Sequence, residues 1–254
     1  MSNEHTGHLE MRDVVVDFNG FRAINHFNFS VTKGELRCLI GPNGAGKTTA
    51  LDLICGKIKP TYGEIHFEGF ELGDMEEHEI ARAGIGRKFQ IPSVFPELTV
   101  MENLDVAYPK HIGVIANALQ FGRGHEKDGL EKLAELVGLQ DELKTIAGHL
   151  SHGQTQWLEI CLLLAQDPEL ILMDEPTAGM TVQETRKTAE LFNRLKGRHT
   201  LIVVEHDMGF VKEIGDVISV MDMGQMLAEG TVSEIEENAA VKDAYLGSGG
   251  INGA

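Results

Sequence analysis

The sequence contains no long apolar run. Spanning a bilayer as a helix takes about 18 or more consecutive apolar residues, and no stretch approaches that length. The opening segment, MSNEHTGH, also lacks the basic and then apolar layout of a signal peptide. We therefore expect a soluble chain with no membrane span of its own.

Basic residues are in short supply. The chain carries 22 Lys and Arg against 39 Asp and Glu, for a formal net charge of −17. A surface that binds nucleic acid usually brings an excess of Lys and Arg to the phosphates, and an anionic membrane attracts the same residues. This balance argues against nucleic acid as a partner. Any membrane association is expected to run through another protein.

Cysteine is scarce as well. Cys38, Cys55 and Cys161 are the only three, and their spacing fits no metal site. We expect three buried thiols in a cytosolic protein rather than disulfides or metal ligands. The apolar fraction of 42% is ordinary for a globular protein, and 254 residues suffice for one large domain or two closely packed lobes.

Four short apolar runs, at 36–40, 170–173, 201–204 and 217–221, indicate buried strands. Continuous apolar runs of this length suit strands that helices cover on both faces, as in a parallel sheet. The segment 183–195 lies between two of these runs and places apolar residues at helical spacing. Together they predict a strand–helix–strand crossover and an α/β fold.

The N-terminal region follows a different pattern. Residues 9–18 and 27–32 alternate with a period near two, and 63–69 has the pattern of a further strand between turns. Such alternation is typical of strands with one solvated face, so we expect an antiparallel sheet beside the parallel one.

The middle of the chain is helical in composition. We expect a helical lobe at about 97–166, inserted between strands of the core, in which 130–139 forms one buried helix face. Residues 109–129 have the least regular pattern and are expected to form a loose connection with one helix. The glycine-rich end, 247–254, is expected to be disordered.

The strongest chemical signal is GPNGAGKT at 41–48, which fits G-x-x-x-x-G-K-[ST] in full and follows a strand-like run. Its glycines let backbone N–H groups converge on phosphate oxygens; Lys47 brings a positive charge to the β- and γ-phosphates, and the Thr48 hydroxyl can ligate Mg²⁺. A ligand-free glycine turn would leave the Lys and Thr in register unexplained. The predicted nucleotide-binding residues are Gly41, Pro42, Asn43, Gly44, Ala45, Gly46, Lys47, Thr48 and Thr49.

Two carboxylates, Asp174 and Glu175, follow the apolar run at 170–173. Ligands of open α/β sheets bind at the carboxyl ends of the strands, where these residues would stand. We expect Asp174 to hold Mg²⁺ and Glu175 to orient or deprotonate an attacking water. Acidic residues after a strand also serve as helix caps, so the pair is persuasive only beside the phosphate loop.

A third motif, LSHGQ at 150–154, precedes a helix with apolar positions that include Trp157 and Leu164. Ser151 fits the N-cap of that helix. The same glycine-containing helix start is also a potential anion site, and both roles can hold together.

These motifs, in this order, resemble the nucleotide-binding subunits of ABC transporters over nearly the whole chain. The resemblance implies a P-loop NTPase fold of ABC type, with a RecA-like core, an antiparallel β subdomain and an inserted helical subdomain, in one domain over 1–246. It implies that Ser151, Gly153 and Gln154 belong to the signature motif, which contacts the γ-phosphate of ATP held by the opposite subunit.

The resemblance also implies roles for residues outside these motifs. Gln90 corresponds to the lid glutamine that senses Mg²⁺ and the γ-phosphate, and His206 to the switch histidine. Phe18 falls where the family places an aromatic residue that stacks on adenine. Phe21 competes for that role, and either ring could instead belong to the core.

A narrower resemblance is to the branched-chain amino acid group of importers, through 89–103 and the ending AYLG at 244–247. Within that group, LSHGQ, AGMT at 178–181 and VEHDM at 204–208 resemble the ATPase subunit of urea transporters most. Two residues depart from the wider family. His152 replaces a glycine of the signature, and Thr181 replaces an aspartate that helps link the two active sites.

The resemblance implies an ATPase that uses ATP and Mg²⁺ and powers an importer for a small solute, urea first and branched-chain amino acids as the alternative. Its partners would be transmembrane permease subunits and a second ABC ATPase, identical or related, at the cytoplasmic face of the membrane. A soluble ABC ATPase of translation or DNA repair is a rival, but this chain has neither two ATPase domains nor a long coiled coil. A small-molecule kinase would leave the signature helix and His206 unexplained.

Overall fold

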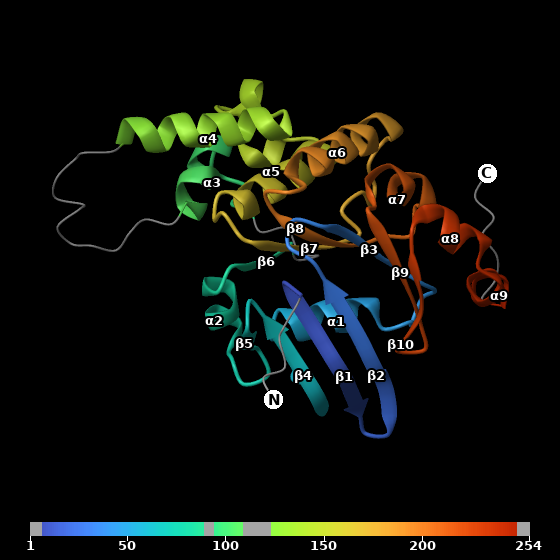
Figure 1. Cartoon of the computed structure of the whole chain (residues 1–254). Coiled ribbons are helices and arrows are strands. Elements are labelled where there is room, and N and C mark those ends of the chain that lie inside the picture. The colour runs from blue at the N-terminus through green and yellow to red at the C-terminus, as the bar shows by residue number, and fades with distance from the viewer. Residues whose placement is uncertain (1–6, 89–93, 109–122, 248–254) are drawn as a thin grey trace. The chain divides into compact units, whose positions relative to one another are not determined.

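A computed structural model of the chain describes residues 7–88, 94–108 and 123–247. The chain divides into two compact units (Figure 1). The first unit comprises Met1–Arg87, Glu169–Pro176 and Asn193–Ala254, and the second comprises Lys88–Pro168 and Thr177–Phe192. Gln90 and the predicted tail beyond Gly247 lie outside the described residues, as does 109–122 of the irregular segment.

An antiparallel sheet is built from the N-terminal part of the first unit, as predicted. Its strand order is β2-β1-β4-β5, and the strands are β1 (Leu9–Phe18), β2 (Phe21–Val31), β4 (Tyr62–Phe67) and β5 (Phe70–Glu71). Strand β2 begins six residues before the predicted 27, because Asn19 and Gly20 adopt positive φ angles of 54° and 94° and close a two-residue hairpin turn.

The predicted parallel strands form the centre of a six-stranded sheet of order β10-β9-β3-β8-β7-β6. Strand β3 pairs in parallel with β8 and β9, and β8 pairs in parallel with β7. The runs in β3, β7 and β8 are fully buried, as their composition indicates, and the run in β9 is buried except for Val217, which is half-buried. The edge strand β10 is antiparallel to β9 and was not predicted. The strands are β3 (Leu36–Ile40), β6 (Ile85–Lys88), β7 (Leu170–Asp174), β8 (Thr200–Val204), β9 (Val217–Asp222) and β10 (Gln225–Gly230).

One apolar core joins the two sheets within the first unit. Helix α1 (Lys47–Ile54) contributes Leu51, Leu53 and Ile54 to this core, which also holds Phe27 of β2. In Figure 1, α1 lies beside the strands of the antiparallel sheet, which places the end of the phosphate loop against a packed scaffold. The other helices of this unit are α2 (Glu77–Arg82), α7 (Met208–Ile214), α8 (Val232–Glu237) and α9 (Ala239–Gly247).

The second unit is helical where the structure describes it, apart from the last residue of β6. Helix α5 is its centre and buries Trp157, Leu158, Ile160 and four further apolar residues. A buried ion pair fixes this helix to the start of the unit, since Lys88 Nζ lies 3.3 Å from Glu159 Oε2. The elements are α3 (Val100–Ala107), α4 (Arg123–Val137), the 3₁₀ turns η1 (Gln140–Glu142) and η2 (Ala147–His149), α5 (His152–Leu164) and most of α6 (Val182–Leu195).

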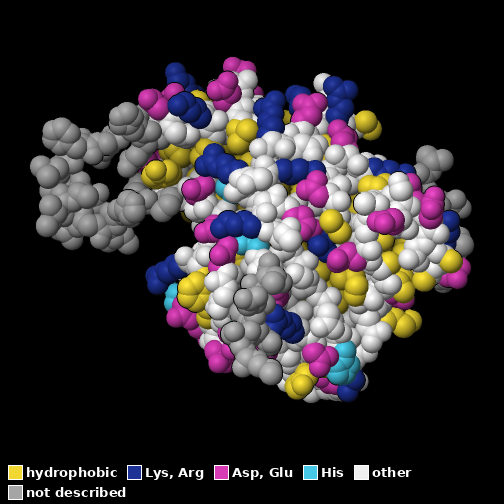
Figure 2. Space-filling model, viewed as in Figure 1, with side chains coloured by type: hydrophobic (Ala, Val, Ile, Leu, Met, Phe, Trp, Pro, Cys, Tyr) yellow, Lys and Arg dark blue, Asp and Glu magenta, His cyan; other side chains and the backbone are white. Residues whose placement is uncertain are grey.

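The three cysteines are buried and unpaired, as predicted. Burial raises the pKa of both Cys38 and Cys161 to about 12. Among the described residues, no helix combines the length and apolarity that a membrane crossing requires. On the face drawn in Figure 2, acidic and basic side chains are interspersed.

Candidate nucleotide-binding site

The phosphate loop connects β3 to α1 and depends on glycine at two points. Gly41 passes so close to β9 that a Cβ atom there would lie 2.2 Å from the Met221 carbonyl oxygen. Gly46 has a φ of 103°, and a Cβ there would lie 2.7 Å from the carbonyl oxygen of Ala23. Any larger residue would displace backbone at both positions, which explains the motif's glycines in packing terms.

Lys47 begins α1 and folds over the loop that precedes it. Its ammonium group donates hydrogen bonds to the carbonyl oxygens of Gly41 and Pro42, at 2.8 and 3.0 Å. Burial lowers the pKa of Lys47, and the charges of Glu175 and Asp174 oppose that shift. The cation is therefore half-buried over the loop and under the influence of two carboxylate charges, a position from which it can meet a polyphosphate.

Thr48 and Asp174 meet although 126 positions separate them in the sequence. Burial raises the pKa of Asp174, and hydrogen bonding from the Thr48 hydroxyl opposes that shift. Within the described part of the chain, Asp174 Oδ2 is buried and has no hydrogen-bond partner, and Arg87 Nη2 lies 3.9 Å from it. The Thr48 hydroxyl and the Asp174 carboxylate, one oxygen of which is unsatisfied, are hard ligands of the kind Mg²⁺ prefers, so these residues fit that ion.

Glu175 and His206 come together at the ends of β7 and β8. His206 Nδ1 lies 3.6 Å from Glu175 Oε1, and both side chains are exposed. Glu175 has a φ of 47°, a left-handed conformation that is uncommon for a residue with a side chain. Its N–H donates to the Val204 carbonyl at 2.9 Å, which holds it there. Local strain of this kind is concentrated at functional sites.

Two residues near the loop were not predicted. Arg87, at the end of β6, pairs with Asp52 of α1 as well as approaching Asp174. Tyr245 of α9 has a pKa raised to about 12 by burial, and a backbone hydrogen bond with Gly41 opposes that shift. No local pattern indicates that either residue lies at the loop, and Tyr245 is about two hundred residues away from it in the sequence. Only the fold brings them to it.

The predicted adenine-stacking residues face each other across the first hairpin. Phe18 and Phe21 are cross-strand partners, and they are 50% and 67% exposed. Neither ring belongs to the core, so the alternative that one of them is a core residue is wrong. Both remain available for a base.

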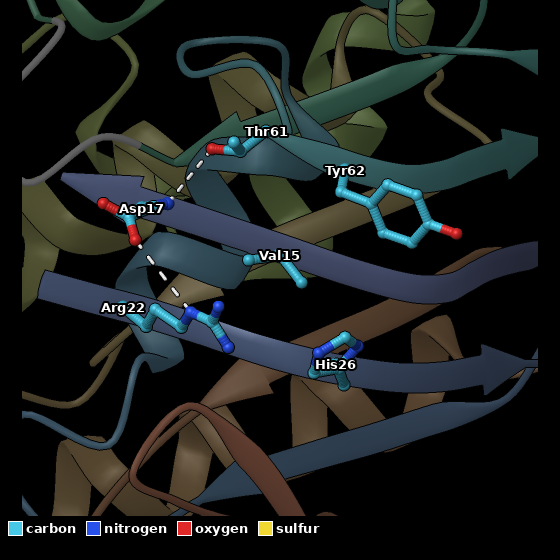
Figure 3. Close-up of a pocket in the computed structure, with 6 residues that line it drawn as sticks. All are labelled: Val15, Asp17, Arg22, His26, Thr61 and Tyr62. Carbon is cyan, nitrogen blue, oxygen red and sulfur yellow. Dashed lines mark hydrogen bonds and ion pairs between the residues drawn. The ribbon is translucent and has the colours of Figure 1, made fainter. Parts of the chain in front are cut away.

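A cavity of about 340 Å³ lies on the antiparallel sheet (Figure 3). It is separate from the phosphate loop, since no residue of 41–48 lines it. Thr61 Oγ1 accepts a hydrogen bond from the Asp17 N–H, and Asp17 lies 3.9 Å from Arg22 (Figure 3). The lining residues are Val15, Asp17, Arg22, His26, Thr61 and Tyr62.

The signature segment stands in the second unit, at the start of α5. Ser151 is the N-cap: its hydroxyl oxygen accepts from the Gln154 N–H at 3.2 Å, and its own N–H donates to Gln154 Oε1 at 2.9 Å. This reciprocal capping box confirms the expected N-cap. Gly153 is buried, and a Cβ atom there would lie 2.1 Å from Glu184 Oε1.

Thr181, the second departure from the family pattern, caps α6. Its N–H and hydroxyl both donate to Glu184 Oε2 at 2.8 Å, and its hydroxyl oxygen accepts from the Glu184 N–H at 3.3 Å. These bonds hold the pKa of Glu184 below its ordinary value. A threonine is well suited to this position, and the T-x-x-E spacing is a signal that sequence reasoning could have used.

The structure thus gathers some predicted residues and leaves others apart. The phosphate loop, including Asn43, Gly44, Ala45 and Thr49, meets Asp174 and Glu175 with His206 in the first unit. Ser151, Gly153 and Gln154 belong to the second unit. Gln90 lies outside the described residues.

Comparisons with known proteins agree with this geometry. Residues 24–178 match the family described as ABC transporter. The chain is 37% identical to the high-affinity branched-chain amino acid transport ATP-binding protein BraF of Pseudomonas aeruginosa, over 94% of this chain and 97% of that protein. It is 36% identical to LivG of Escherichia coli, of the same printed description, over the same shares of the two chains.

Solved structures extend the agreement to the fold. An ATP-binding cassette of an ABC transporter in its ADP conformation matches with a TM-score of 0.81 and 30% identity, over 94% of this chain and 98% of that one. A dimeric cassette in a post-hydrolysis state, bound to ADP and phosphate, matches with a TM-score of 0.71 and 26% identity, over 88% and 98%. The predicted fold class is confirmed, and the chain belongs to the ABC transporter family as an ATP-hydrolysing cassette.

Proposed function

We propose that the loop at 41–48 binds the triphosphate of ATP and that the carboxylates after β7 direct its hydrolysis. The observation that carries this proposal is the convergence of Lys47 and Thr48 with Asp174 and Glu175, from two distant segments, at the carboxyl ends of β3 and β7. Ligands of open α/β sheets bind at that edge. Phosphoryl transfer needs positioning and charge neutralisation more than covalent chemistry.

Each residue then has a distinct task. Backbone N–H groups of the loop and Lys47 bind phosphate oxygens, and Thr48 and Asp174 would hold Mg²⁺, which supplies further neutralisation of charge. Glu175 orients the attacking water and accepts its proton. His206, 3.6 Å from Glu175, keeps that carboxylate in place. Gln90 is proposed as a further residue at the metal and γ-phosphate, and Phe18 or Phe21 as the platform for adenine.

The site is completed by a second subunit in this proposal. Ser151, Gly153 and Gln154 would contact the γ-phosphate bound to a partner ATPase, of the same or a related sequence, through a helix N-terminus that favours anions. ATP binding and closure of the pair are then linked. The two units together form one ATPase domain over 1–246, which works with permease subunits at the cytoplasmic face and reaches the membrane only through them.

The transported solute is proposed from the relatives. The proteins BraF and LivG are described as serving branched-chain amino acid transport, which makes those amino acids the first candidate. Urea is the second candidate, because His152 and Thr181 match the pattern that resembles urea transporters. Reconstituting the chain with its permeases and measuring ATP-dependent uptake of labelled leucine and urea decides between them. Uptake of neither solute would reject both assignments.

Replacing Glu175 by Gln tests the catalytic assignment. The amide keeps the shape of the side chain but cannot accept a proton, so turnover should fall by about 10² or more. ATP binding should persist, and size-exclusion chromatography with ATP should show an increased fraction of dimer. Glu71→Gln, an exposed change on β5, is the matched control and should leave turnover unchanged. Undiminished hydrolysis by the Glu175→Gln variant would remove the assignment.

A further inference from the structure

His152, the unusual residue of the signature segment, contacts a second loop within its own unit. Its Nε2 lies 3.0 Å from the carbonyl oxygen of Ala178. A carbonyl oxygen only accepts, so Nε2 must carry the hydrogen and donate it. The ring is otherwise exposed, and this bond gives it a fixed direction.

The backbone of the same loop lies against the imidazole. Gly179 has a φ of 75°, and a Cβ atom there would lie 2.9 Å from His152 Nε2. The loop can approach this closely only because residue 179 has no side chain.

A second connection runs beside the first. Gly153 lies against the Glu184 carboxylate, and that carboxylate is held by both the N–H and the hydroxyl of Thr181. Two consecutive residues of the signature segment thus contact the loop 178–181 and the helix that the loop starts. The two departures from the family pattern, His152 and Thr181, belong to one assembly.

We propose that His152 is a positioning residue that fixes the loop 178–181 to the first turn of α5. The loop begins three residues after Glu175 in the sequence, and α5 begins at the segment that the proposed function assigns to a phosphate. This role rests on the proposed function. Through His152, the segment that follows the catalytic carboxylate is held to the signature segment of the same subunit. A glycine at 152 could not make this link.

Hydrogen exchange on the full chain without nucleotide tests the contact directly. His152→Phe keeps a ring but removes the donor, while His152→Gln places an amide N–H the same number of bonds from Cβ. The loss of one hydrogen bond should speed exchange in 178–181 about threefold to tenfold in His152→Phe. Exchange in His152→Gln should stay near the wild-type rate.

His149→Phe is the matched control, because His149 is also exposed and lies two residues before Ser151. It should leave exchange in 178–181 unchanged. Equal exchange in wild type and His152→Phe, or equal acceleration by His149→Phe, would overturn the proposal.

Steady-state ATP hydrolysis provides the second measurement. The triphosphate-binding residues of the first unit are untouched, so KM for ATP should stay within about twofold while kcat of His152→Phe falls by about threefold to tenfold. His152→Gln should recover most of kcat. Faster loop exchange with an unchanged kcat would reject the positioning role. Failure of the wild type to hydrolyse ATP would instead count against the proposed function, and exchange would still decide the contact.

Discussion

At the scale of single residues, the site holds an acidic group in an unfavourable environment. Asp174 is buried, one of its oxygens lacks a hydrogen bond, and its pKa is raised chiefly by burial. Thr48 and Arg87 offset part of that effect. Residues that bind a cation commonly weaken the fold that carries them, because the charge is arranged for the ligand.

Asp174→Asn should therefore stabilise the chain in the absence of Mg²⁺ and nucleotide, while abolishing Mg²⁺-dependent hydrolysis. A carboxyl whose pKa is raised by folding binds its proton more tightly in the folded chain, so its ionisation destabilises the fold as pH rises. The increase in melting temperature should be largest at neutral pH and shrink as pH falls toward the ordinary value of 3.8. Thermal melts of the wild type and Asp174→Asn between neutral pH and pH 3.8 measure this difference. A difference in melting temperature that grows as the pH falls would contradict the prediction.

At the scale of secondary-structure elements, the same capping box recurs at sites with different tasks. Ser151 caps α5, where a phosphate contact is proposed, and Thr231 caps α8, where none is. In each, the capping oxygen accepts from the backbone N–H three residues later. Comparing Ser151 with Thr231 therefore distinguishes the stabilising role of a cap from a role in ligand binding.

Substitution of both caps provides the comparison. Ser151→Ala and Thr231→Ala should each lower the free energy of unfolding by about 1 kcal/mol, since each removes a cap. Ser151→Asp and Thr231→Asp should keep stability, because Asp also caps well. Only Ser151→Asp should strongly reduce ATP hydrolysis, because it brings a negative charge to the proposed phosphate contact. Normal hydrolysis by Ser151→Asp, measured beside the Thr231 variants, would exclude that contact.

At the scale of the whole molecule, buried cysteines report on each unit separately. Cys38 lies in β3 of the first unit and Cys161 in α5 of the second. Because burial raises the pKa of both thiols to about 12, neither should react with a thiol reagent at pH 8 until its unit opens.

MgATP should therefore slow the labelling of Cys38. A ligand at 100 times its Kd reduces the open population about a hundredfold, because it binds only the folded unit. Variants that retain one cysteine, with Cys55 replaced in both, allow each rate to be measured. If MgATP slows the labelling of Cys161 less than that of Cys38, the two units open separately. Equal slowing at both cysteines means that the units open together. A rate of Cys38 labelling that MgATP does not change would contradict nucleotide binding at the loop that follows β3.

Sequence reasoning depends on local signals, and the structure confirms the buried strands that it predicted. The buried strands, the phosphate loop and the Asp174–Glu175 pair were predicted from short patterns whose physical meaning does not depend on distant residues. It did not predict β10, whose residues are only partly buried and follow no clear period. It also missed contacts made across the chain, such as Arg87 with Asp52, Tyr245 with Gly41 and His152 with Ala178. No periodicity encodes these, because each depends on how the strands and helices pack.

The hairpin that presents Phe18 and Phe21 side by side has a consequence for selectivity. An aromatic ring stacks on the flat face of a base and leaves its hydrogen-bonding edge unread, so stacking tolerates any purine. With two exposed rings available, loss of one should be partly compensated by the other. Under the proposed stacking role, the chain should accept GTP nearly as well as ATP, and the supply of nucleotide in the cell would decide which one drives it.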